Sequence, residues 1–135
     1  MIAAARATLA RFHRPPWHRL AAAIRGRDGK ISTGIHLGAT IGRLSICAEA
    51  VALGRAIMEG DGRIAVIAAL RAPKPGEAGR EPALVAPCGA CREMIFDFDP
   101  EALVILPHPE HGAVKLPIRA LLPVPYPRFP AAGPD

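Results

Sequence analysis

The sequence has few aromatic residues, few cysteines and no long apolar run. Aromatic side chains make up 4% of the 135 residues, and there are three cysteines. No apolar run reaches the ~18–20 residues that a membrane-spanning helix requires, so we expect no contact with a membrane. Three cysteines cannot all pair within one chain, and no signal-peptide-like segment precedes them, which favours a reducing, cytoplasmic location.

Acidic residues are absent from residues 1–27, although this segment holds six arginines. It accounts for much of the formal net charge of +5, which comes from 17 basic and 12 acidic residues. Such a segment resembles a transit peptide or a basic arm. Because Ala and Leu run through it, we interpret residues 1–17 as a basic N-terminal helix with a solvated face. Pro15-Pro16 ends that helix.

A hydrophobic content of 50% and a charged content of 21% predict one folded domain over residues 1–135. The pattern of apolar residues predicts helices and strands that alternate along the chain. We expect helices near 2–12, 45–58 and 88–98, strands near 20–24, 30–37, 64–70, 103–106 and 114–116, a loop at 72–83 and a helical turn at 118–122. Residues 123–135 form a Pro-rich C-terminal tail without regular structure. This order predicts an α/β fold whose sheet is covered on both faces.

The cysteines form the pattern most indicative of chemistry. Cys88 and Cys91 are three residues apart at the start of a predicted helix, so their thiols face the same way. A CxxC pair alone is compatible with a metal site or a redox pair. Cys47, at the start of another predicted helix, supplies a third thiolate. Tetrahedral Zn²⁺ held by three thiolates keeps one open position, which is typical of a catalytic site.

Glu49 follows Cys47 by two residues. A carboxylate beside zinc-activated water can move a proton, because zinc lowers the pKa of that water to about 7. The alternative interpretation is an ordinary first-turn glutamate that the helix dipole favours.

The sequence Cys47-Ala48-Glu49, followed by Pro87-Cys88-Gly89-Ala90-Cys91-Arg92, resembles the three-cysteine branch of the cytidine deaminase family. Asp28-Gly29-Lys30-Ile31 resembles that family's hairpin, and Leu121-Leu122-Pro123 with Tyr126 resembles its C-terminal segment. The resemblance therefore covers roughly residues 18–126.

This resemblance implies a three-layer α/β/α fold with a central mixed sheet of about five strands, and a homotetramer. It implies Zn²⁺ on Cys47, Cys88 and Cys91, and Glu49 as general acid and base. It also implies that backbone groups of Ala48 and Pro87 contact the substrate's amidine edge and the departing ammonia. The aromatic residue matching Tyr126 reaches a neighbouring subunit's pocket in the family.

The sequence departs from the family at the sugar-binding positions. His36 stands where the family has an Asn, and Gly38 stands where it has a Glu. His36 can still form one hydrogen bond with a substrate, whereas Gly38 offers no side chain. Ala50 replaces the family's Arg, and Arg43, Arg55 or Arg92 could substitute for that cation. Cytidine itself is therefore expected to be a poor substrate.

The predicted function is zinc-dependent hydrolytic deamination of a cytosine nucleoside or a related aminated heterocycle. One alternative is a blasticidin-S-type antibiotic deaminase, because Cys-Ala-Glu followed by Val51-Ala52-Leu53-Gly54 also resembles that group. Another is a non-catalytic zinc-stabilised binding module. Glu49 distinguishes these, since a structural site has no use for a carboxylate beside an open metal position. A nucleic-acid partner is not expected, because no aromatic residues alternate with basic ones near the motif.

Overall fold

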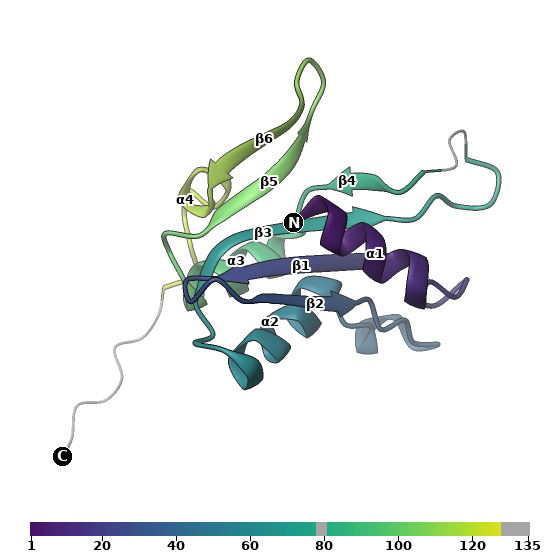
Figure 1. Cartoon of the computed structure of the whole chain (residues 1–135), viewed down its shortest axis with the longest axis horizontal. Coiled ribbons are helices and arrows are strands. Elements are labelled where there is room, and N and C mark those ends of the chain that lie inside the picture. The colour runs from purple at the N-terminus through teal and green to yellow at the C-terminus, as the bar shows by residue number, and fades with distance from the viewer. Residues whose placement is uncertain (78–80, 128–135) are drawn as a thin grey trace.

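A computed structural model describes residues 1–77 and 81–127 of the chain (Figure 1). Its centre is a six-stranded mixed sheet in the order β2-β1-β3-β5-β6, with β4 also paired to β3. The strands are β1 (Leu20–Gly26), β2 (Ile31–Ile35), β3 (Ile64–Arg71), β4 (Ala83–Val85), β5 (Leu103–His108) and β6 (Gly112–Pro117). Only the β3–β5 pair is parallel among the described strands; the other pairs are antiparallel.

Helices cover both faces of this sheet. Helix α1 (Ile2–Phe12) lies on one face, and α2 (Ala48–Glu59) and α3 (Gly89–Phe98) lie on the other (Figure 1). A 3₁₀ turn (Gly42–Leu44) and the short helix α4 (Ile118–Leu121) complete the described elements. The predicted three-layer α/β/α fold is therefore confirmed.

Alternation along β1 explains how one strand serves two layers. Ala21 and Ala23 pack with Leu9 of α1 in one buried cluster. Ala22 and Ile24 point to the opposite face and pack in the larger cluster that includes residues of α2 and α3. Because β1 is buried on both faces, it is apolar without interruption from Leu20 to Ile24.

The sequence predicted most elements to within a few residues. The predicted helix at 45–58 begins later, because Cys47 is extended at φ −63° and ψ 147° and forms the N-cap of α2. The predicted loop at 72–83 ends in a strand, β4, that the sequence did not indicate. Three residues paired on one side are too short to give a periodic signal.

The tail prediction falls partly outside the described residues, which end at residue 127. Residues 123–127 have no regular structure, as expected from their prolines. No described helix is long and apolar enough to cross a membrane.

Candidate active site

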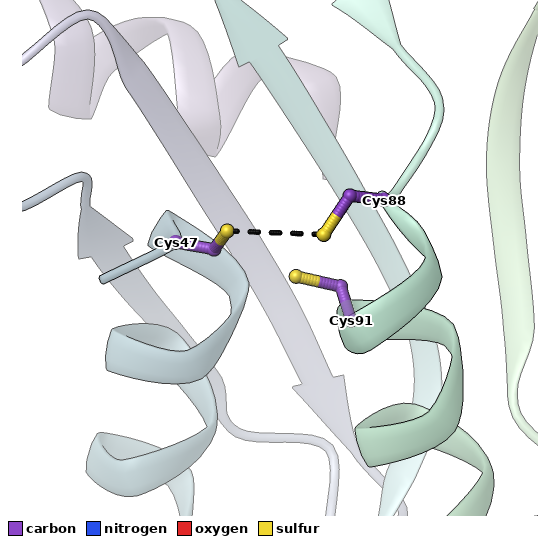
Figure 2. A group of neighbouring side chains, drawn as sticks. All are labelled: Cys47, Cys88 and Cys91. Atoms are coloured by element: carbon purple, nitrogen blue, oxygen red, sulfur yellow. Dashed lines mark hydrogen bonds between the residues drawn. The ribbon is translucent and has the colours of Figure 1, made fainter. Parts of the chain in front are cut away.

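Three thiols converge between the N-termini of α2 and α3, as Figure 2 shows. Cys47 is the N-cap of α2, Cys88 is the N-cap of α3, and Cys91 lies in the first turn of α3. The Sγ atoms of Cys47 and Cys88 are 3.9 Å apart, and all three lie within 4.8 Å of one another. The cysteines that the sequence brought forward are therefore neighbours in space.

The spacing of the thiols fits a tetrahedral metal ion. Zinc–sulfur bonds of about 2.3 Å at tetrahedral angles place two sulfurs about 3.8 Å apart. That separation matches Cys47 and Cys88 without rearrangement. Three soft sulfur donors favour Zn²⁺ over hard cations such as Mg²⁺. The three thiols therefore form a group that could hold a zinc ion.

The protein environment makes the thiols unequal. Burial raises the pKa of Cys91 far above its usual range, and the charge of Glu49 adds to the effect. Burial is also the largest cause of the raised pKa of Cys47. At Cys88 burial acts in the same direction, but hydrogen bonds from the backbone N–H of Cys91 and from the neighbouring thiols outweigh it and lower the pKa. Cys91 is the buried member of the three, Cys47 is half-buried and Cys88 is exposed. Three neighbouring thiolates repel one another, and a bound cation would balance their charge.

Glu49 is buried beside the thiols. Its side chain is 4% exposed, and burial raises the pKa of its carboxyl group. A hydrogen bond from its own backbone N–H and a hydrogen bond with Cys91 partly oppose this shift. A carboxyl group with a raised pKa holds a proton more tightly than an ordinary glutamate, which suits a group that acts as an acid as well as a base.

The remaining predicted substrate contacts surround this centre. Ala48 is fully buried at the first position of α2, and Pro87 and Glu49 line one small cavity against Ile67 and Ile95. His36 directly follows β2, and its neighbour Leu37 pairs with Ile46, the residue before Cys47. Tyr126, by contrast, does not lie among these predicted substrate contacts. Its side chain is 72% exposed, and its backbone N–H donates to the carboxylate of Glu93 at 3.1 Å.

Arg92 lies in α3, directly after Cys91, and bonds to the segment before Cys88. Its Nε donates to the Pro87 carbonyl at 3.0 Å, and its guanidinium also donates to the Leu121 carbonyl at 3.2 Å. Arg55, by contrast, is paired with Glu59 on the exposed side of α2. Of the suggested replacements for an Arg at position 50, Arg92 therefore has contacts that place it beside the site.

Trp17 contacts the segment that carries His36, and sequence reasoning did not indicate this contact. The Trp17 carbonyl accepts hydrogen bonds from His36 Nδ1 at 2.9 Å and from the Gly38 backbone N–H at 3.2 Å. An exposed tryptophan before a strand gives no periodic signal. Its partners are also about twenty residues away, so the sequence could not indicate the contact.

A second group of possible metal ligands lies on the β5–β6 hairpin: His108, Glu110 and His111. The two imidazole rings are stacked at 4.6 Å, with 13° between their planes. A metal ion binds in the plane of an imidazole ring, and nearly parallel stacked planes do not meet at one ion. Both histidines are thus surface residues in this arrangement, as the sequence indicated.

Comparison with known proteins places these features in context. The model of the cytidine and deoxycytidylate deaminase zinc-binding region matches residues 1–106. A blasticidin-S deaminase of Bacillus cereus is 40% identical over 111 residues, which cover 82% of this chain and 79% of that protein. The crystal structure of a cytidine deaminase from Burkholderia pseudomallei has a TM-score of 0.73 at 28% identity, covering 93% of this chain and 95% of that chain. A cytidine deaminase from Mycobacterium leprae shares the fold, with a TM-score of 0.70 at 24% identity over 90% of this chain and 93% of that chain.

Proposed function

The chain belongs to the family defined by the cytidine and deoxycytidylate deaminase zinc-binding region, and we propose that it hydrolyses the exocyclic amine of a cytosine-like ring. The products are the ring carbonyl compound and ammonia. The observation that carries this proposal is the buried Glu49 carboxyl beside three convergent thiols.

Cys47, Cys88 and Cys91 hold the zinc ion in this proposal. Bound zinc supplies a nucleophile at neutral pH, because it lowers the pKa of a water molecule to about 7. Glu49 would take one proton from the water and deliver it to the ring nitrogen. After the oxygen has added to the ring carbon, Glu49 would take the second proton from that hydroxyl and deliver it to the leaving amine, which departs as ammonia. The raised pKa of Glu49 suits this exchange, because the group must be a base and an acid in one cycle.

Substrate orientation falls to the groups around Glu49. The backbone of Ala48 and Pro87 contacts the amidine edge of the ring, and His36 contacts the substituent on the ring. Arg92 holds the Pro87 carbonyl, which fixes the segment that carries Cys88. Tyr126, exposed on the surface of the chain, is available to a neighbouring subunit.

A blasticidin-S-type substrate is the second candidate. The relative at 40% identity is named for that activity. Gly38 adds a specific observation: a Cβ atom there would lie 2.6 Å from the Trp17 carbonyl oxygen. Residue 38, which stands where the family has a sugar-binding Glu, therefore has no room for a carboxylate side chain.

A purely structural zinc module is disfavoured, because it does not need a buried carboxyl beside the metal.

We also propose that the enzyme works as a cytoplasmic homotetramer, in pyrimidine salvage if its substrate is a nucleoside. Four large apolar side chains between residues 37 and 46, in the segment that precedes α2, are 43–58% exposed. They are Leu37, Ile41, Leu44 and Ile46. A neighbouring copy would cover them. Three free thiols suit a reducing compartment.

Ammonia release tests the activity. Zinc-loaded protein is incubated with cytidine, cytosine, deoxycytidylate and blasticidin S, and ammonia is measured. We expect release from cytidine or blasticidin S. Failure of all four compounds with one zinc bound per chain would contradict the proposed reaction.

A further inference from the structure

We propose that Trp17 is a positioning residue whose carbonyl holds His36 in one tautomer, so that His36 offers the substrate a hydrogen-bond acceptor. The inference rests on the proposed deaminase function and names what the site recognises. It predicts that the substituent carried by the heterocycle has a donor, such as a hydroxyl or amino group, opposite His36.

The hydrogen bonds around His36 fix the position of its proton. His36 Nδ1 lies 2.9 Å from the Trp17 carbonyl oxygen. A carbonyl oxygen only accepts, so Nδ1 must carry the hydrogen. In the neutral imidazole the other ring nitrogen, Nε2, then has a free lone pair and can accept one hydrogen bond.

The backbone of the same segment cannot easily move away from Trp17. The Gly38 N–H donates to the same Trp17 carbonyl, and the His36 N–H donates to the Leu20 carbonyl at 2.8 Å. In the opposite direction, His18 Nδ1 donates to the His36 carbonyl at 2.8 Å. Segments 17–20 and 36–38 therefore hold each other through bonds in both directions, which we call the Trp17–His36 clamp.

Gly38 lets the clamp close. A Cβ atom at residue 38 would lie 2.6 Å from the Trp17 carbonyl oxygen and 3.1 Å from both its Cα and ring Cε3 atoms. Real Cβ atoms essentially never approach backbone oxygen that closely. A larger residue would therefore displace the carbonyl that His36 uses. The absence of a side chain at Gly38 is a requirement of this packing.

The clamp has a consequence for specificity. Leu37, the residue after His36, exchanges two backbone hydrogen bonds with Ile46, which directly precedes Cys47. The imidazole is therefore carried by a segment that lies next to the candidate metal site. A hydroxyl or amine placed against Nε2 gains a hydrogen bond. A carboxylate or phosphate oxygen would set lone pair against lone pair, which is unfavourable. With Gly38 contributing no second polar group, His36 is the polar side chain that selects the substituent.

Nitrogen NMR of the zinc-loaded protein tests the tautomer directly. The His36 ring signals are assigned by their loss in His36→Asn. We expect the proton on Nδ1 of neutral His36; finding it on Nε2 would overturn the proposal. Gly38→Ala should release the ring to a mixture of tautomers. Gly42→Ala is the matched control, because its Cβ would meet no atom within 4 Å, and it should leave the His36 spectrum unchanged.

Kinetics test the acceptor role on whichever of cytidine and blasticidin S the protein deaminates. We expect His36→Ala to raise KM about tenfold, as for one lost hydrogen bond, and to change kcat less than about threefold. His36→Asn, which keeps an acceptor oxygen, should recover most of that loss. An unchanged KM in His36→Ala would overturn the inference while leaving the deaminase proposal intact. Absence of ammonia release from wild type would instead contradict the proposed function, and the NMR result would still decide the tautomer.

Discussion

Cys91 has the least exposed thiol of the zinc centre, with 2% of its surface accessible. Burial and the nearby charge of Glu49 raise its pKa, so it is protonated when no cation is present. Zinc binding must therefore release a proton from this thiol. At the residue scale, a bound cation would balance the charge of the buried Cys91 thiolate.

The first prediction concerns this thiol. Cys91→Ser should lower zinc content from about one per chain to a small fraction, because a serine hydroxyl does not ionise as a zinc ligand at neutral pH. Metal analysis of protein purified under reducing conditions measures this. Ala90→Ser places a hydroxyl one residue away, at an exposed position, and should keep its zinc. Full zinc content in Cys91→Ser would contradict the ligand assignment.

Sequence reasoning identified the cysteines that lie within 4.8 Å of one another in the structure, because Cys47, Cys88 and Cys91 belong to two short motifs. Their role as zinc ligands, and that of Glu49 as proton carrier, stay predictions. It could not identify the clamp between Trp17 and His36, because that contact depends on a loop conformation. The close approach of the Trp17 carbonyl to residue 38 depends on the same loop, so the sequence could not indicate it either.

At the scale of elements, the site depends on how closely β2 approaches α2. A Cβ atom on Gly34 of β2 would lie 2.5 Å from the Ala48 carbonyl oxygen and would also overlap the Ala52 backbone N. The small side chains of Ala48 and Ala52 face this strand and are fully buried. The contact fixes the first turn of α2, where Glu49 lies.

We expect Gly34→Ala to lower the free energy of unfolding by about 2–3 kcal/mol or more, because the strand and helix must separate to admit a methyl group. Thermal or urea unfolding measures this. Gly54→Ala on α2 is the control: a Cβ there meets nothing within 4 Å, and alanine should stabilise the helix by roughly 0.5–1 kcal/mol. Equal stability of Gly34→Ala and wild type would show that the β2–α2 contact is looser than described.

The end of α3 is held by an ion pair. Asp99 is fully buried, and Arg27 donates to both of its carboxylate oxygens, at 2.6 and 2.9 Å. The bond with Arg27 is the main cause of the lowered pKa of Asp99. The pair joins the turn after β1 to α3, the helix that carries Cys88 and Cys91.

Asp99→Asn should lower the free energy of unfolding by about 2–3 kcal/mol at neutral pH, because Arg27 loses a charged partner. A folded pKa below the unfolded value means that the stabilisation is present above pH ~4 and is lost as pH falls through the folded pKa. The difference between wild type and variant should therefore shrink in acid. Urea unfolding at several pH values measures it, and a difference that grows in acid would contradict the account.

At the scale of the whole molecule, alternation of apolar segments was enough to predict the layers. The apolar strands β1 and β3 required cover on both faces, and α1, α2 and α3 provide it. Strand β4 was missed because its three residues pair only with β3 among the described strands. Subunit assembly depends on surfaces of several chains, so one sequence indicates it only through exposed apolar residues.

We expect the protein to be larger than a monomer in solution. Leu37, Ile41 and Leu44 are exposed in the segment before α2, and a second copy would bury such apolar side chains. Light scattering at micromolar concentration should give about four times 14.2 kDa. A monomer mass would contradict the homotetramer. Leu44→Glu should weaken the assembly, whereas Met58→Glu, at an exposed position near the end of α2, is the control.

The central claim is that Glu49 moves the proton in a zinc-dependent deamination. The most direct measurement is ammonia release by zinc-loaded Glu49→Gln, with zinc content determined on the same sample. The amide keeps the shape of the side chain but cannot exchange a proton, so we expect about one zinc per chain and activity lowered ~10²–10⁴-fold. Glu59→Gln, at the exposed end of α2, should keep wild-type activity. Near-wild-type ammonia release by Glu49→Gln would contradict the account.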